Sequence, residues 1–176
     1  MTATACLLPP GGERPLTAGE TELVRAVFGS AVDPAPVRIR RRRWFPFQPR
    51  STVMAPCGHI HFHPEGRRYS DDFATEGADL RGLFVHEMTH VWQAQTRGKL
   101  WLPLMRHPFC RYDYELQEGW PLERYGIEQQ AEIVRHAYHA RLGEPIPGGL
   151  PFEWLAERLR EVQQRTSYSR PSRLTR

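Results

Sequence analysis

The sequence predicts an α+β domain in which a small sheet packs beside several helices. Two stretches, 37–43 and 52–63, contain the apolar–polar alternation of strands with one buried face. Four other stretches repeat apolar residues at the spacing of amphipathic helices. The chain has 176 residues, of which 40% are hydrophobic and 25% charged, so its size and composition fit one globular domain.

The expected domain covers 17–165. It follows a flexible lead-in at 1–16, rich in Pro and Gly, and precedes a basic flexible tail at 166–176. The start of the chain has no basic segment followed by an apolar run, so we find no secretory signal. No stretch approaches the roughly 20 apolar residues of a membrane span. We therefore expect a cytoplasmic protein, and export by a route without a signal peptide stays open.

The first helix is predicted over 18–28. Thr17 and Glu20 have the spacing of a capping box, in which each side chain binds the backbone N–H of the other. Gly29 supplies the stop.

Two extended stretches follow. The first, 37–43, alternates apolar and basic residues before two prolines interrupt it. The second, 52–63, ends in a strict alternation that places His59, His61 and His63 on one face, opposite the apolar residues between them.

Three further helices are predicted, over about 78–96, 127–142 and 152–164, with a short strand between them at 111–116. Gly98 and Gly143 lie just beyond two of these helices. The core-facing residues expected in the helix over 78–96 are Leu83, Phe84, Met88, Val91 and Trp92.

That helix contains His86-Glu87-Met88-Thr89-His90. Residues four apart lie one turn apart on one face, so His86 and His90 can present two imidazoles to one metal ion. Glu87 then lies beside the ion, where its carboxylate can accept a proton from water. Cys6, Cys57 and Cys110 are too few and too scattered to form a thiolate zinc site, so His and carboxylate ligands must hold any metal.

A catalytic zinc takes three protein ligands and keeps one position open. The helix over 127–142 places Glu128, Glu132 and His136 on one face at intervals of four residues. We predict Glu128 as the third ligand and Glu132 as the group that orients a ligand imidazole. The reverse assignment stays open, with Glu132 or His136 as the alternative ligand.

Other side chains are expected near this centre. His59, His61 and His63 could hold a second metal, although lining a cleft is the favoured role, because their strand directly precedes the metal-binding helix. Tyr125 is a further cleft residue. Candidates for a donor to a developing oxyanion are Tyr112, Tyr114, Tyr125 and His107.

The motif at 86–90 resembles that of the zincin metallopeptidases. With Glu128 on a later helix it is similar to the gluzincin branch, in which an Asp often occupies the position where Glu132 stands here. The metzincin extension is absent after His90. The segments 84–93 and 125–133 also resemble the small bacterial vgr-related metallopeptidase domains, associated with Rhs and Vgr elements of secretion or toxin systems. This resemblance implies a zincin-like fold, a bacterial source and an effector or processing role.

The expected activity is hydrolysis of peptide bonds in a peptide or protein substrate, with one zinc ion per chain and Glu87 as general base. The resemblance adds a secretion-system or toxin partner. The main alternative is a non-catalytic zinc module that holds the fold together or docks a partner. A second alternative, weaker because no nucleic-acid motif accompanies it, is nucleic-acid binding through the arginine-rich run 38–43 of this chain, whose formal net charge is +4.

Overall fold

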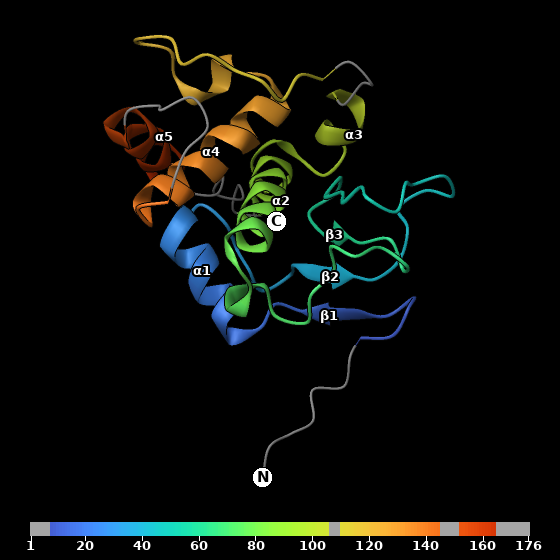
Figure 1. The fold of residues 1–176 in the computed structure, drawn as a ribbon. Coiled ribbons are helices and arrows are strands. Elements are labelled where there is room, and N and C mark those ends of the chain that lie inside the picture. Colours follow the sequence, from blue (N-terminus) through green and yellow to red (C-terminus); the bar gives the residue numbers. More distant parts are fainter. Residues whose placement is uncertain (1–7, 106–109, 145–151, 165–176) are drawn as a thin grey trace, which may run out of the picture.

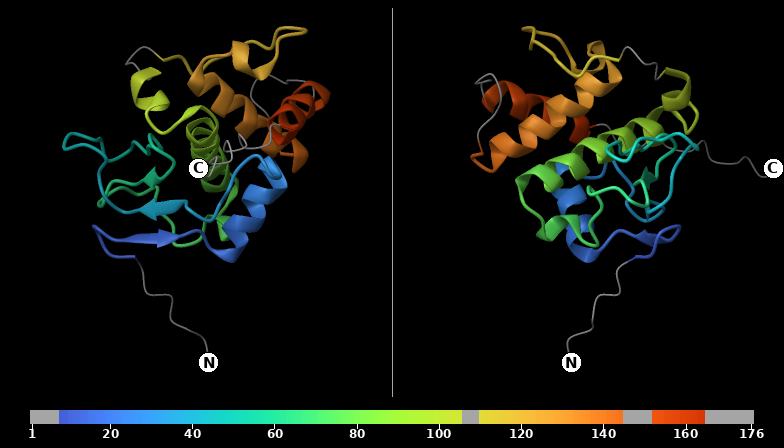
Figure 2. Two further views of the ribbon diagram at one scale, coloured as in Figure 1. Left: turned by 180° about the vertical axis from the view of Figure 1, so that it is seen from behind. Right: turned by 45° about the vertical axis from the view of Figure 1, so that its right-hand side comes forward.

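The computed structural model describes residues 8–105, 110–144 and 152–164. The expectations for His107, Cys6 and the 166–176 tail lie outside these residues. Helix α2 (Ala78–Arg97) runs through the middle of the molecule, between a small sheet and a pair of later helices (Figure 1). The right-hand view of Figure 2 shows α2 lengthwise, with α4 (Ile127–Arg141) crossing it on one side. The α+β prediction is confirmed.

The sheet has three short strands in the order β1 (Glu13–Pro15), β2 (Arg38–Arg40) and β3 (Ile60–His61). Strand β1 pairs antiparallel to β2, with Glu13 opposite Arg40, whereas β2 and β3 are parallel. Both predicted strand regions are thus much longer than the strands observed. The prolines and glycines between them limit regular pairing to a few residues.

Strand β1 lies inside the stretch expected to be a flexible lead-in. Its pairing continues beyond the strand, because Gly11 N–H donates to Arg41 O and Arg41 N–H donates to Gly12 O, at 2.8 and 2.9 Å. The composition of the lead-in could not reveal this strand, since the partner segment lies more than 20 residues away.

The helix predictions agree closely with the structure. Helix α1 (Ala18–Phe28) has the predicted capping box: Glu20 N–H donates to Thr17 Oγ1, and Thr17 N–H to Glu20 Oε2, at 3.0 and 2.9 Å. Helix α5 (Phe152–Gln164) has the predicted bounds, and α4 ends one residue before its predicted end. These helices were predictable because their caps and apolar stripes are local features.

The segment 110–121 contains no strand, so the prediction of one at 111–116 is wrong. The side chain of Gln129 donates to the backbone carbonyl of Asp113, and most side chains of this segment are exposed. None of the described strands pairs with the segment. Two 3-10 turns (Phe73–Thr75 and Leu122–Arg124) and the short helix α3 (Trp101–Met105) were not predicted.

An aromatic column joins the sheet to α2. The ring of Phe73 stacks on Phe62, after β3, and on Phe84 of α2, at centroid distances of 5.2 and 5.4 Å. All three side chains are buried, as are the five core-facing α2 residues predicted from the sequence. This column contributes to fixing the position of α2 relative to the sheet.

Helices α2 and α4 approach closely at Gly82. A Cβ atom at that position would lie 2.2 Å from His139 Nε2 and 3.1 Å from Arg135 Nε, so any larger residue would force the ring of His139 to move. The contact joins the start of α2 to the last turns of α4, while Gln93 of α2 donates to Ile127 O at the start of α4. Within the described residues, no helix is long and apolar enough to cross a membrane.

Candidate metal centre

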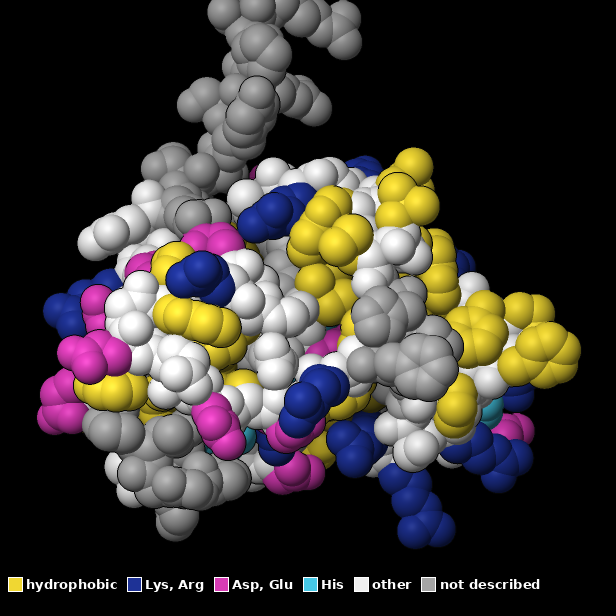
Figure 3. Space-filling view, turned by 90° about the horizontal axis from the view of Figure 1, so that it is seen from above, with side chains coloured by type: hydrophobic (Ala, Val, Ile, Leu, Met, Phe, Trp, Pro, Cys, Tyr) yellow, Lys and Arg dark blue, Asp and Glu magenta, His cyan; other side chains and the backbone are white. Residues whose placement is uncertain are grey.

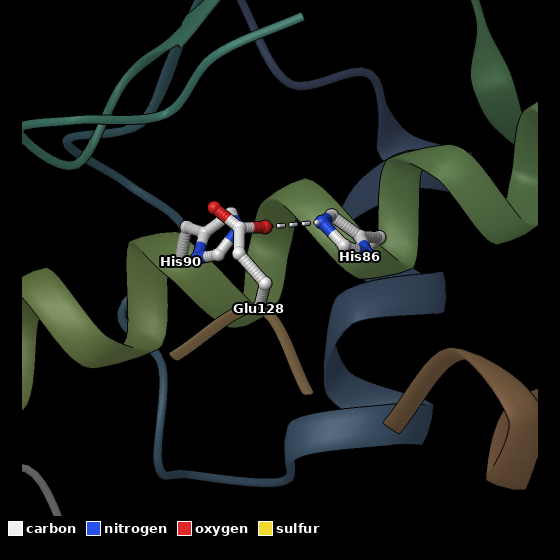
Figure 4. A group of neighbouring side chains, drawn as sticks. All are labelled: His86, His90 and Glu128. Carbon is white, nitrogen blue, oxygen red and sulfur yellow. Dashed lines mark hydrogen bonds and ion pairs between the residues drawn. The ribbon is translucent and has the colours of Figure 1, made fainter. Parts of the chain in front are cut away.

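Helices α2 and α4 bring His86, His90 and Glu128 together (Figure 4). Both imidazoles project from one face of α2, with ring centroids 5.0 Å apart. One oxygen, Glu128 Oε2, lies 3.3 Å from His86 Nε2 and 3.1 Å from His90 Nε2. The three residues predicted as ligands therefore converge on one point, although Glu128 lies 38 positions after His90 in the sequence.

Glu128 lies in the first turn of α4, where the helix dipole favours a carboxylate. Gln93, which sequence reasoning missed, fixes this turn against α2. Its Nε2 donates to Ile127 O and to Gln130 Oε1, at 3.1 and 3.0 Å. Its position three residues after His90, within reach along the helix, is the signal that could have identified it.

The same Gln93 sets the tautomer of His90. Because its Nε2 donates to α4, its Oε1 is the atom that faces His90 Nδ1, at 2.8 Å. An amide oxygen only accepts, so Nδ1 holds the ring proton and Nε2 offers a lone pair to the centre.

Glu132 acts on the other ligand imidazole. Its Oε1 lies 2.8 Å from His86 Nδ1, and the two groups form an ion pair when His86 is protonated, although the ring N–H is out of line for a regular hydrogen bond. Since Nδ1 is on the side of the ring opposite to Nε2, this geometry fits the orienting role predicted for Glu132. The structure brings Glu128, and not Glu132, to the point where the two Nε2 atoms meet.

The cluster fits a zinc ion. Zinc with bonds of 2.0–2.2 Å in a tetrahedron places its ligand atoms about 3.3 Å apart, close to the two distances to Glu128 Oε2. His86, His90 and Glu128 are 6%, 2% and 1% exposed. A charged carboxylate is costly to bury this deeply unless a cation lies beside it, and two imidazoles with one carboxylate are a common zinc ligand set.

The electrostatics of the metal-free cluster agree with a cation site. Burial lowers the pKa of His86, but its contacts with the carboxylates of Glu128 and Glu132 outweigh burial and raise the pKa to about 9. Burial raises the pKa of Glu132, yet His86 and Arg135 together hold it below its ordinary value. A proton on His86 therefore takes the place that a metal charge would occupy.

Glu87 is buried, and among the described residues its Oε2 has no hydrogen-bond partner. It lines a cavity of about 290 Å³, which we call the polar cavity, on the His86 side of the centre. The residues around this cavity are Ser51, Thr52, Val53, Arg68, Leu83, His86, Glu87, Tyr112, Glu132 and Arg135. The carboxylate is thus available to a molecule that enters beside the ligands.

A second cavity, of about 230 Å³, reaches the centre from the His90 side. We call it the apolar cavity, and its walls are Trp44, Phe45, Met54, Ala55, Pro56, His90, Leu102, Pro103 and Glu128. Apart from His90 and Glu128, these walls could not be predicted, because they come from irregular segments and from helix α3, which was not predicted.

His136 extends the contacts of Glu132 and lies outside the ligand cluster. Tyr114, whose pKa burial raises, donates its hydroxyl proton to His136 Nδ1 at 2.7 Å. The proton of His136 is then on Nε2, which faces Glu132 Oε2 at 3.5 Å. His136 thus supports Glu132 from behind.

The three strand histidines do not join the centre. In the described part of the chain, the one group that could hold a metal is His86, His90 and Glu128. None of the three lines the polar or the apolar cavity. His61 packs its ring edge against Trp44, a wall of the apolar cavity, and His63 Nε2 accepts from Arg43 Nε at 2.9 Å.

Of the tyrosines proposed as oxyanion donors, Tyr112 lies nearest the ligands. Its ring is nearly parallel to that of His86, with centroids 6.2 Å apart, and it lines the polar cavity. Tyr114 is bound to His136, and the hydroxyl of Tyr125 accepts from Gln117 N–H. Tyr125 and Glu128 line a larger neighbouring cavity of about 520 Å³, which supports the expectation that Tyr125 is a cleft residue.

The arginine-rich run is engaged within the fold. Arg40 and Arg42 pair with Glu13 at 3.1 and 2.9 Å, and Arg41 donates to Leu8 O and Pro64 O. Arg43 donates to His63. These contacts give the run a structural role and leave the nucleic-acid alternative with no supporting observation.

Comparison with known proteins places the chain in context. No protein-family model matches it. It is 42% identical, in an alignment of 129 residues that covers 69% of this chain, to the type VI secretion system spike protein VgrG2b of Pseudomonas aeruginosa, and the match spans only 12% of that protein. It is also similar to a solved structure, the effector domain of Pseudomonas aeruginosa VgrG2b, with 34% identity and a TM-score of 0.66 over 85% of this chain and 83% of that domain.

Proposed function

Because this chain belongs to the family of the VgrG2b effector domain, we propose that it is a secretion-linked effector domain and that its chemistry is zinc-dependent hydrolysis of peptide bonds. The secretion part of the proposal follows from the relative, whose name places it in a type VI secretion spike. The chemical part rests on the residues of this chain.

One observation supports the chemistry above the others. His86 Nε2, His90 Nε2 and Glu128 Oε2 meet at a buried point, and the carboxylate of Glu87 lies beside them at the wall of a cavity. Two imidazoles, one carboxylate ligand and a second carboxylate that is not a ligand are the groups that zinc-dependent hydrolysis requires.

The zinc ion, when bound, would lower the pKa of a water molecule toward about 7 and polarise the scissile carbonyl. Glu87 accepts the proton of that water as it attacks, then donates the proton to the leaving amine. Tyr112, next to His86 in the polar cavity, is the described residue best placed to donate to the developing oxyanion. Glu132 holds His86 in position throughout.

The substitution Glu87→Gln tests this proposal. It keeps the side-chain shape and removes the base, so the variant should bind zinc as the wild type does while losing hydrolysis of unstructured peptides by about a hundredfold or more. Glu22→Gln, on the exposed surface of α1, is the matched control and should leave both unchanged. Undiminished hydrolysis by the zinc-loaded Glu87→Gln protein would refute the mechanism.

The deep burial of the ligands also suits a zinc ion that only holds α2 and α4 together. In that case Glu87→Gln would change nothing measurable, whereas removal of the metal would lower the thermal midpoint. A peptidase loses turnover in both experiments, so the pair of measurements separates the two functions.

A further inference from the structure

The two cavities lie at successive positions along the same ligand helix. The polar cavity includes His86 and Glu87, and the apolar cavity includes His90, one turn further along α2. A single chain segment borders both: 51–53 lines the polar cavity and 54–56 lines the apolar one. A molecule that crosses the metal centre along this segment therefore meets one cavity on each side.

The apolar cavity has the chemistry and size for a large hydrophobic side chain. Its walls include Trp44, Met54, Pro56 and Leu102, and its volume of about 230 Å³ exceeds the roughly 150 Å³ cavity that holds a benzene molecule. His61 supports the ring of Trp44 from behind, with centroids 5.3 Å apart. Figure 3 shows hydrophobic side chains gathered on the side of the molecule where α3 lies, and α3 contributes Leu102 and Pro103 to the cavity wall.

Two arginine side chains lie at the wall of the polar cavity, Arg68 and Arg135. Arg135 is already paired, with Asp79 at 3.3 Å and with Glu132 at 3.5 Å. Arg68 is exposed at the cavity wall, and within the described parts of the chain no acidic group lies within ion-pair distance of it. A guanidinium in this position can bind a carboxylate with two parallel hydrogen bonds.

We propose, on the basis of the proposed peptidase function, that the substrate is a peptide with a large apolar side chain on one side of the scissile bond and a carboxylate on the other. The apolar side chain enters the cavity walled by Trp44, and the carboxylate binds Arg68. The carboxylate is that of an acidic side chain or of a free C-terminus, since both offer the same two oxygens.

Binding to the zinc-loaded Glu87→Gln protein tests the inference without turnover. The probes are hexapeptides of Ala and Gly with Phe–Glu or Glu–Phe at the centre and both ends blocked. Companion peptides replace Phe by Ala, replace Glu by Gln, or carry Phe with an unblocked C-terminus. We expect replacement of Phe to weaken binding roughly tenfold, and replacement of Glu about three- to tenfold. Comparison of the blocked and unblocked peptides identifies the source of the carboxylate.

Two pairs of variants assign these preferences to residues. Trp44→Ala should abolish the preference for Phe over Ala, whereas Phe47→Ala, three residues away and outside the cavity, should keep it. Arg68→Ala should abolish the preference for the carboxylate, whereas Arg67→Ala should keep it. Equal binding of all peptides, or equal effects of each variant and its control, would overturn the inference.

This inference and the proposed function fail in different ways. Selective binding by the Glu87→Gln protein without cleavage by the wild type contradicts hydrolysis and keeps the binding preferences. Cleavage by the wild type that ignores Phe and the carboxylate keeps hydrolysis and overturns the inference.

Discussion

Glu132 Oε1 lies 2.8 Å from Nδ1 of His86, on the side of the imidazole opposite to the nitrogen that faces Glu128. The carboxylate thus orients the imidazole of a predicted ligand and would make it a stronger electron donor to a bound metal, without itself reaching the point where the three predicted ligand atoms meet.

Glu132→Gln should weaken zinc affinity about 10- to 100-fold, because the amide cannot stabilise positive charge on His86. A competition titration against a chromophoric chelator measures this change. Glu153→Gln, on the exposed surface of α5, is a control for loss of one carboxylate. Complete loss of zinc from Glu132→Gln would mean that Glu132 is a ligand, and unaltered affinity would mean that the contact has no effect.

Zinc binding should release a proton from His86 below about pH 9, because the pKa of His86 in the metal-free protein is about 9. The apparent affinity should therefore rise about tenfold per pH unit between pH 6.5 and 9. Calorimetry at pH 7.5 in buffers of different ionisation enthalpy measures the proton released. A binding enthalpy independent of the buffer would contradict this prediction.

The same raised pKa affects the stability of the metal-free protein. Protonated His86 stabilises the fold fully below the unfolded-state pKa of about 6.5, and this contribution is lost as the pH rises through about 9. Urea unfolding of the chelator-treated protein should therefore show the wild type losing more free energy of unfolding than Glu132→Gln between pH 6.5 and 9. Equal losses of the free energy of unfolding in the two proteins would contradict the ion pair between His86 and Glu132.

His61 should give the opposite pH dependence. Burial and the neighbouring Arg40 lower its pKa to about 4. In the unfolded chain His61 therefore takes up a proton near pH 6.5, whereas in the folded chain it stays neutral until about pH 4. The free energy of unfolding should fall as the pH drops from 6.5 to 4. His61→Asn should have a shallower slope than the wild type in urea titrations, and identical slopes would assign the effect to other groups.

Gly82→Ala should destabilise the fold by about 1–2 kcal/mol, despite the better helix propensity of Ala, because its Cβ would meet the ring of His139. The double variant Gly82→Ala/His139→Ala removes that ring and should recover part of the loss. Thermal or urea unfolding measures both. Stabilisation by Gly82→Ala alone would show that the ring of His139 can move aside without cost.

The parts of the fold that could be predicted are those determined by neighbouring residues. The capping box of Thr17 and Glu20 and the glycines after the helices fixed helix bounds to within a residue or two. Strand β1 and the small sheet were poorly predicted, since their pairing joins distant segments.

The site follows the same rule. His86, Glu87 and His90 form a local motif. Helical spacing limited the candidates for the third ligand to a few side chains on α4. Among these, the structure places Glu128 close to both imidazoles. The cavity walls could not be predicted: Trp44 and Arg68 come from irregular segments whose paths depend on the whole fold.

The central claim is that His86, His90 and Glu128 hold one zinc ion. Metal analysis of the purified, zinc-loaded chain, beside His86→Ala and Glu128→Ala, tests it most directly. We predict one zinc per wild-type chain and loss of the metal in both variants. A wild-type chain without zinc, or variants that retain it, would contradict the claim, and retention in Glu128→Ala alone would move the third ligand to Glu132 or His136.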